Sequence, residues 1–313
     1  VRHVIYDIPK TNRLVFDDKA TIDKNHACMK ILGNPQESHL TLHVAATSGK
    51  GSICYGIEAI LRAHGKQTGL TVSPHVYDIR ERMQLNGRLL EKKVFVETLN
   101  EVLAKTLDSN LSLSYFELLI AMSYTIFSKN RLDYTVIETG FGGRLDATNV
   151  ISRADKVCVL GQIGLDHTHV LGDTLEKIAS EKAGIIQPGN HVIALKQTDG
   201  VNKVFEDRAA AMDATIEWVE QSDDYQIANS GLARAACTYI AGRDGWVFDD
   251  SLAKTLLKSV KIPARFEKRS LKGHLVIIDG AHNPQKLSAL AERVLREEKY
   301  PATIVFAIGE RKD

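Results

Sequence analysis

The strongest constraint on the fold is the segment HVAATSGKGS at residues 43–52, where an apolar strand pattern runs into a glycine-rich loop. Apolar residues alternate over 40–44 as in a strand, and those after the loop fall on one face of a helix that ends near Gly65. Glycines let backbone N–H groups turn toward an anion, Lys50 adds a positive charge, and the helix N-terminus adds its dipole. The segment therefore predicts a loop that binds the phosphates of a nucleoside triphosphate.

This loop departs from the usual phosphate-loop pattern at two positions. The usual pattern has a glycine six residues before the lysine, and this chain has Val44 there. Gly51 replaces the serine or threonine that usually follows the lysine and binds Mg²⁺. The alternative interpretation is a glycine-rich turn that binds nothing. The strand pattern before the loop and the amphipathic helix pattern after it favour the phosphate loop.

The composition is that of a globular protein: 313 residues, 44% hydrophobic and 25% charged, enough for about two domains. The formal net charge is +1 with both signs interspersed, so neither nucleic acid nor a membrane surface is an expected partner. No signal-peptide layout or long apolar run occurs, and the cysteines lack C-x-x-C spacing, which favours buried thiols in a reducing compartment. We expect a cytoplasmic protein and a monomer. The cysteines are Cys28, Cys54, Cys158 and Cys237.

Short Val/Ile-rich strands alternate with helical stretches, which predicts an α/β fold with a largely parallel sheet. The strands are expected near 40–46, 67–72, 133–138, 156–161, 191–195 and 275–279. The helices are expected near 51–64, 114–129, 174–184 and 283–297. A capping box, Ser114 to Glu117, opens the second of these helices. Charged residues and Pro263 indicate a linker at 261–272, between a domain at 1–260 and the start of an α/β domain at 273–313.

Two segments place polar side chains where predicted strands end. Residues 71–75, TVSPH, present the hydroxyl of Ser73, and residues 134–150, YTVIETGFGGRLDATNV, present Glu138 just before a glycine-rich turn. Ligands of parallel sheets bind at the carboxyl ends of the strands. A carboxylate at the same edge as a phosphate loop suits Mg²⁺, which takes oxygen ligands and keeps some waters. The alternative is a solvated acid at a strand end.

Two further segments carry titratable groups. In GLDHTHVLGDTLEKIASEKAGII, the residues Asp166, His167 and His169 precede a helix that carries Lys182 amid apolar sequence. Partial desolvation would lower the pKa of this amine and make it nucleophilic, as carbamylation by CO₂ or Schiff-base chemistry requires; an exposed helix lysine is the alternative. In LVIIDGAHNP, a strand runs into a polar helix start at 279–283.

Together these segments resemble the Mur-type ATP-dependent amide ligases, and within them the folylpolyglutamate synthase / dihydrofolate synthase family. The matching strings, in the family's order, are HVAATSGKGS, GLTVSPH with RERMQLNG, ETGFGGRLDATNV, GLDHTHVLGDTLEKIASEKAGIIQPG, IPARFE and IDGAHNP. The resemblance implies a P-loop central domain followed by a Rossmann-like C-terminal domain. It also implies that ATP phosphorylates a pteroate or folate carboxylate, and that the amine of L-glutamate then displaces phosphate.

The resemblance also implies roles for individual residues. Lys50, Lys182 and His167 would be catalytic, and Asp146 would contact the pterin. Two Mg²⁺ ions would be held by Ser73, Glu138, His167 and a carbamylated Lys182. The nucleotide would be bound by Thr47, Ser48, Gly49, Lys50, Gly51, Ser52, Asn229, Arg265, Asp279 and His282. The expected partners are ATP, L-glutamate, and dihydropteroate or a reduced folate.

The chain departs from the family pattern in two respects. Ala46 and Ser48 replace the residues of the usual Gly-Thr-Asn-Gly-Lys string, and a methyl group at Ala46 requires a negative φ there. The chain also stops at IVFAIGERKD, about a hundred residues short of a complete C-terminal domain. The alternatives are therefore another Mur-type amino-acid ligase, and a nucleotide-binding relative or fragment without ligase activity.

Overall fold

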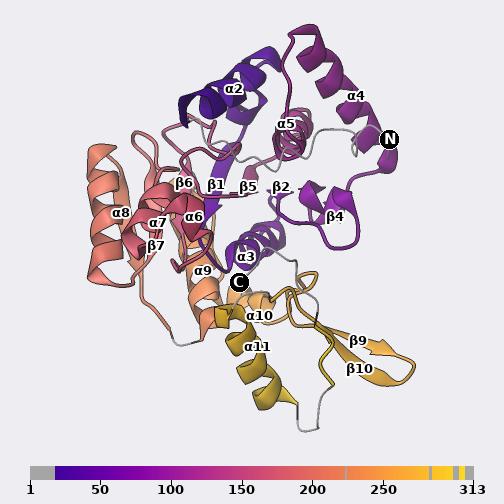
Figure 1. Cartoon of the computed structure of the whole chain (residues 1–313), viewed down its shortest axis with the longest axis vertical. Coiled ribbons are helices and arrows are strands. Elements are labelled where there is room, and N and C mark those ends of the chain that lie inside the picture. Colours follow the sequence, from indigo (N-terminus) through magenta and orange to yellow (C-terminus); the bar gives the residue numbers. More distant parts are fainter. Residues whose placement is uncertain (1–17, 223, 282–283, 299–302, 307–313) are drawn as a thin grey trace. The chain divides into compact units, whose positions relative to one another are not determined.

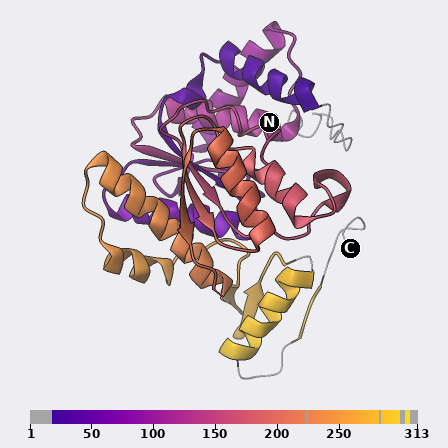
Figure 2. The same cartoon turned by 90° about the vertical axis from the view of Figure 1, so that its left-hand side faces the viewer.

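The computed structural model describes residues 18–222, 224–281, 284–298 and 303–306, and it divides the chain into two compact units. Unit 1 is Val1–Val260 and unit 2 is Lys261–Asp313. Figures 1 and 2 show the chain coloured along its sequence.

Unit 1 is built on an eight-stranded sheet in the order β4-β3-β2-β5-β1-β6-β7-β8. The pairs from β2 to β8 are parallel, whereas β3 and β4 join one edge in antiparallel fashion. The mostly parallel α/β fold expected from the sequence is confirmed. The strands are β1 (Leu40–Ala45), β2 (Thr68–Thr71), β3 (Gln84–Leu85), β4 (Arg88–Leu89), β5 (Tyr134–Glu138), β6 (Val157–Leu160), β7 (His191–Leu195) and β8 (Thr215–Val219).

Helices cover both faces of this sheet (Figures 1 and 2). One face packs on α3 (Lys50–Ala63), α9 (Tyr225–Asp244) and α10 (Asp250–Leu257). The other face packs on α2 (Asp18–Ile31), α4 (Lys92–Asp108) and α5 (Tyr115–Ser128), and further along on α7 (Leu175–Ala183) and α8 (Asp199–Ala211). The short helices are η1 (Pro35–Glu37), η2 (Ile79–Arg82) and α6 (Thr168–Leu171).

The two faces follow from the alternation of side chains along each strand. On β1, Val44 belongs to the core beneath α3, whereas Ala45 belongs to the core beneath α7. Both sides of the central strands are apolar, as expected of a parallel sheet covered on two faces. The capping box that opens α5 is confirmed, because Ser114 and Glu117 exchange hydrogen bonds between side chain and backbone.

Several elements lie outside the sequence prediction. Helix α9 packs on α3 mainly through small side chains such as Ala233, Ala236 and Cys237, which give a weak amphipathic signal. Strand β8 lies at the edge of the sheet and is only partly buried. The other elements that the patterns did not indicate are α2, α4, α8, α10, β3, β4 and β9 (Glu267–Leu271).

Unit 2 contains an antiparallel hairpin of β9 and β10 (His274–Ile278), followed by α11 (Pro284–Glu297). Strand β9 falls inside the stretch expected to be a linker at 261–272, so that expectation was wrong for residues 267–271. The cause is a two-residue turn: Lys272 and Gly273 both have positive φ, 49° and 82°, which is the backbone of a tight hairpin loop. Charged side chains on β9 are exposed and conceal the strand from a hydropathy pattern.

Within the described residues, none of the helices combines the length and the apolar character needed to cross a bilayer.

Candidate active site

The loop between β1 and α3 is held in a conformation that only glycine adopts without strain. Gly49 is the N-cap of α3 and has φ 84°, in the left-handed region. A Cβ at this position would lie 2.5 Å from Oδ1 of Asn229, which comes from α9. The structure therefore brings Asn229 against the phosphate-type loop, although the two are far apart in sequence.

Ala46 takes the place of the usual glycine without a positive φ; residues with positive φ in the described chain do not include it. Its methyl group is fully buried and lies 3.0 Å from the position that a Cβ on Gly161 would occupy. The methyl group thus fits because Gly161, just after β6, has no side chain.

Side chains of the loop fasten it to the segment after β6. The Thr47 hydroxyl donates to the carbonyl of Gly164 and accepts from its N–H, both at 3.1 Å. Lys50 Nζ donates to the carbonyl of Ala46 at 3.0 Å, so the ammonium lies over the loop. The Ser48 hydroxyl is buried, and no hydrogen-bond partner for it lies among the described residues. It is therefore available to a ligand held in the loop.

Glu138 ends β5 beside this loop. It pairs in register with Val44 of β1, and its side chain is 4% exposed. Its Oε2 accepts from the backbone N–H of Ser73 at 2.7 Å, and both carboxylate oxygens lie just under 4 Å from where a Cβ on Gly51 would be. The structure thus brings Glu138 and Ser73 together at the first turn of α3.

The donor set at this point suits a hard divalent cation. Glu138 supplies a carboxylate next to the phosphate-type loop, and Ser73, whose N–H donates to that carboxylate, carries a hydroxyl. Mg²⁺ binds few protein oxygens together with phosphates and waters. The described residues contain no cluster of three or more His, Cys, Asp or Glu side chains that could form a metal cage. His167 packs edge-on against the ring of Phe141, with 4.8 Å between centroids.

Lys182 lies near the end of α7 and is only 4% exposed. Burial, together with the positive charge of Lys50, lowers the pKa of its ammonium to about 7, whereas Asp166 and Asp146 act in the opposite direction. The desolvated amine expected from the sequence is confirmed, and an exposed helix lysine is excluded. Lys50 is close enough to Lys182 to disfavour its charge.

The 140–149 loop, which follows β5, is packed directly on α7. A Cβ on Gly143 would lie 2.6 Å from the carbonyl oxygen of Glu181 and 2.9 Å from Cα of Lys182. On the other side, a Cβ on Gly184 would lie 2.4 Å from Cβ of Arg144. The glycines at these positions therefore allow two backbones to touch beside Lys182.

Asp146 lies inside the 140–149 loop, and its carboxylate is used by the loop itself. Oδ2 accepts from the N–H of Phe141 at 2.6 Å, and the N–H of Gly140 also bonds to this carboxylate. Oδ1 accepts from the N–H and the hydroxyl of Thr148, at 2.9 and 2.6 Å. These four donors match the four acceptor sites of a carboxylate. The structure therefore gives Asp146 a part in holding the loop, and its expected contact with a pterin stays a prediction.

Arg82, at the end of η2, makes contacts near Glu138 that its place in the sequence did not indicate. Its Nε donates to Nδ1 of His75 at 2.9 Å, its guanidinium lies 5.6 Å from the ring centroid of Tyr115, and Glu138 is near enough to act on its charge. Burial lowers the pKa of the guanidinium from its ordinary value, but an arginine stays charged at neutral pH. A cation at the sheet edge beside the loop is suited to an anionic ligand.

Two expected nucleotide contacts lie in unit 2 and are brought together there. Asp279 follows β10 and accepts from the N–H groups of Phe266 and Ala281, each at 2.7 Å. The guanidinium of Arg265 covers Gly280, where a Cβ would lie 2.5 Å from its Nη1. The third expected contact, His282, lies outside the described residues.

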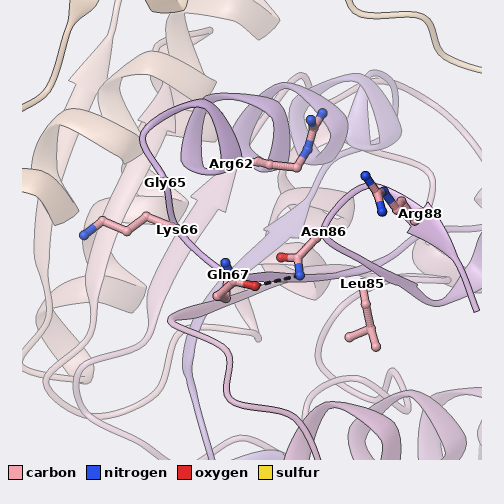
Figure 3. A pocket seen from close by; sticks show the side chains of 7 residues that line it. All are labelled: Arg62, Gly65, Lys66, Gln67, Leu85, Asn86 and Arg88. Atoms are coloured by element: carbon pink, nitrogen blue, oxygen red, sulfur yellow. Dashed lines mark hydrogen bonds between the residues drawn. The ribbon is translucent and has the colours of Figure 1, made fainter.

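A cavity of about 470 Å³ lies away from these residues, at the amino end of β2 (Figure 3). Arg62, Lys66 and Arg88 line it together with the paired amides of Gln67 and Asn86. Arg62 already bonds to buried Glu58, and Lys66 lies over the ring of Trp246. The cavity is thus at the opposite end of the strand from Ser73, and two of its three cations are partnered.

Comparison with known proteins supports this account of the fold. No family model matches the chain. A folylpolyglutamate synthase of Arabidopsis thaliana is 30% identical over 89% of this chain and 53% of its own length. The folylpolyglutamate synthase of Lacticaseibacillus casei is 30% identical over 90% of this chain and 74% of its own length. The dihydrofolate synthetase of Saccharomyces cerevisiae is 29% identical with the same coverage, 90% and 74%. The chain thus spans about half the length of the Arabidopsis relative and about three quarters of the other two.

Solved structures agree. A mutant of L. casei FPGS superposes with a TM-score of 0.87 at 26% identity, covering 98% of this chain and 82% of that one. An FPGS–AMPPCP–folate complex superposes with a TM-score of 0.85 at 26% identity, covering 96% and 80%. The fold is therefore that of the Mur ligases. Because the L. casei relative is matched over most of its own length, the chain belongs to the folylpolyglutamate synthase family.

Gly49→Ala should abolish nucleotide binding, because the new methyl group would displace Asn229 as well as strain the backbone. Gly65→Ala is the matched control: Gly65 has φ 77°, and nothing lies within 4 Å of its Cβ position. The control should lose only the roughly 1–2 kcal/mol of a left-handed alanine and should bind AMPPCP normally by calorimetry. Equal AMPPCP affinity of the two variants would contradict the contact.

Lys182→Met should stabilise the fold more at low pH than at high pH. The folded-state pKa is about 7 against an ordinary 10.5, so burial of the ammonium costs stability fully below pH 7, and this cost fades as pH rises toward 10.5. In bicarbonate-free buffer, the gain in unfolding free energy should be about 3 kcal/mol larger at pH 6 than at pH 9.5, by urea denaturation. Lys177→Met, on the exposed part of the same helix, should show no such trend.

Proposed function

We propose that this protein is an ATP-dependent ligase that adds L-glutamate to the carboxylate of a pteroate or folate through an acyl phosphate. The observation that carries the proposal is the convergence at one sheet edge of the phosphate-type loop, the buried carboxylate of Glu138 and the buried amine of Lys182. Membership of the folylpolyglutamate synthase family supports it, as does the likeness to an FPGS–AMPPCP–folate complex.

In this proposal the loop binds the triphosphate. The N–H groups at the start of α3, the hydroxyls of Ser48 and Ser52, and the amide of Asn229 surround the phosphates, while Lys50 leaves the Ala46 carbonyl for a phosphate oxygen. Thr47, whose hydroxyl is bonded to Gly164, anchors the loop. Arg265, Asp279 and His282 remain proposed contacts of the nucleotide. The substrate carboxylate forms a bond to the γ-phosphorus as the bond to the bridging oxygen breaks. The glutamate amine then attacks the acyl carbon, loses a proton, and expels phosphate.

Glu138 and Ser73 would hold Mg²⁺ next to the phosphates, and a second Mg²⁺ would use His167 and a carbamylated Lys182. When bound, the cations supply positive charge to oxygens that become more negative during phosphoryl transfer. Carbamylation joins the lone pair of Lys182 Nζ to the carbon of CO₂ and releases one proton. It requires a neutral amine, which the lowered pKa of Lys182 provides near pH 7.

Arg82 would bind the substrate carboxylate or the α-carboxylate of glutamate. His75 and Tyr115 hold it from one side, and planar guanidinium groups recognise carboxylates through paired hydrogen bonds. The substrate would be dihydropteroate, a reduced folate, or both. We further propose a monomer and a cytoplasmic location, the latter because all four cysteines are buried free thiols.

The direct test is phosphate release by the purified protein. Release from ATP should require both L-glutamate and a pteroate or folate, because the acyl phosphate is unproductive without its amine. Lys182→Ala should abolish the reaction, with partial rescue by added short carboxylates, whereas Lys177→Ala should remain active. Release driven by a UDP-linked peptidoglycan precursor would indicate another Mur-type ligase, and no release under any condition would favour a nucleotide-binding relative.

Glu138→Gln should lower turnover by about 100-fold or more while AMPPCP affinity changes far less, because metal charge matters most as phosphate charge redistributes. Steady-state kinetics and calorimetry would separate the two effects. Glu97→Gln, which removes an exposed carboxylate on α4, should change neither. Weak AMPPCP binding with intact turnover would remove Glu138 from the site.

A further inference from the structure

A buried chain of hydrogen bonds connects strand β1 to the 140–149 loop. His43 lies on β1, is fully buried, and has its Nε2 2.8 Å from the hydroxyl oxygen of Thr148. That hydroxyl lies 2.6 Å from Oδ1 of Asp146. Three polar side chains thus form a line from the centre of the sheet to the carboxylate that organises the loop.

The direction of each hydrogen bond follows from the inventory of donors and acceptors. Asp146 Oδ1 also accepts the N–H of Thr148, so the Thr148 hydroxyl donates to Asp146 and must accept from its other neighbour. His43 therefore carries its proton on Nε2. Its Nδ1 is then an unprotonated acceptor, and this atom is buried with no hydrogen-bond partner among the described residues. Burial lowers the pKa of the imidazole well below its ordinary value, with Lys156 adding to the effect, so the ring is neutral.

The position of His43 on β1 connects these hydrogen bonds to the phosphate-type loop. Neighbouring residues point to opposite faces of a strand: Val44 packs beneath α3, whereas His43 pairs in register with Ile137 and Cys158 on the side that faces the loop. Four residues after His43, the same strand has become the phosphate-type loop. His43 therefore joins the strand that delivers one part of the site to the loop that forms another.

The 140–149 loop lies at the Asp146 end of these hydrogen bonds, and it covers the buried Lys182. Gly143 touches the backbone of Lys182, and Asn149 donates to the carbonyls of both Arg144 and Gly184, each at 3.0 Å. If Asp146 loses its orientation, the N–H groups of Phe141 and Thr148 lose their acceptor and the loop loosens over α7.

We propose that His43 is a positioning residue for the 140–149 loop, acting through the Thr148 hydroxyl on Asp146 and thereby shaping the site for the pteroate or folate substrate. The last part rests on the function proposed above. His43 touches no reacting atom. Its Nε2–H donates to the Thr148 hydroxyl oxygen, so that the hydrogen of this hydroxyl points at Asp146.

The tautomer can be tested without any ligand. In the chain labelled with ¹⁵N-histidine, the His43 resonances should show a protonated Nε2, a bare Nδ1 and no titration between pH 5 and 8. Thr148→Val should move the Nε2–H resonance, because that proton loses its acceptor. A His43 ring protonated on Nδ1, or one that titrates in this range, would overturn the proposal.

The effect on the loop is tested by hydrogen exchange of three variants. Thr148→Val should raise deuterium uptake over 140–149 by about tenfold or more in rate, and Thr148→Ser, which keeps the hydroxyl, should restore protection. Thr41→Val is the matched control, because Thr41 lies two residues from His43 on the same strand. Its hydroxyl is hydrogen-bonded to Thr135 at 2.8 Å and takes no part in the hydrogen bonds between His43, Thr148 and Asp146. Equal deuterium uptake in Thr148→Val and Thr41→Val would mean that the Thr148 hydrogen bonds protect the 140–149 loop no more than other buried contacts do. That result would overturn the proposal.

Binding measurements connect the loop to the substrate. Thr148→Val should weaken binding of folate or dihydropteroate by about tenfold while AMPPCP affinity stays within about twofold. A loss of both ligands to the same degree would contradict a specific effect on the loop. If the unsubstituted chain binds neither pterin, the proposed function fails, and hydrogen exchange still decides the positioning role of His43.

Discussion

Close contacts at three glycines, with no room for a methyl group, fix the geometry of this site. Gly143 lies against the backbone of Glu181 and Lys182, Gly184 against Arg144, and Gly49 against the side-chain amide of Asn229. Each contact joins segments that are distant in sequence: a loop to a helix, or one helix to another. The buried position of Lys182 and the arrangement of the phosphate-type loop both depend on these contacts, because a displaced backbone would admit water to the amine or move the N–H groups.

Electrostatics at the site disfavours the charged form of Lys182. Burial is the main cause, and the positive charge of Lys50 adds to it. Glu138 supplies one negative charge beside the loop, but Asp146 is committed to its own backbone neighbours. A site with this charge pattern gains most from a ligand that is strongly anionic, as a nucleoside triphosphate is.

Much of this could be predicted from the sequence, because the signals are local. The phosphate-type loop, the strand that delivers Glu138 and the apolar surroundings of Lys182 each lie within about twenty residues, and periodicity and glycine placement indicate them. Asn229 could be identified as a site residue only from the family resemblance, because the small residues of α9 give no sequence signal for a ligand contact. The cationic role of Arg82 and the acceptor count of Asp146 depend on folded neighbours. No pattern reveals that a carboxylate has already used its lone pairs.

The contact between Ala46 and Gly161 has an evolutionary consequence. A methyl group at Ala46 is tolerated only while Gly161 lacks one, since two Cβ atoms there would be 3.0 Å apart. Position 161 is therefore coupled to two neighbours, because Cδ1 of Ile53 also lies 3.0 Å from the Cβ position of Gly161. A lineage with alanine at 46 can gain a side chain at 161 only after both the Ala46 methyl group and the Ile53 side chain have given way, so the order of substitutions, and not only their identity, is constrained.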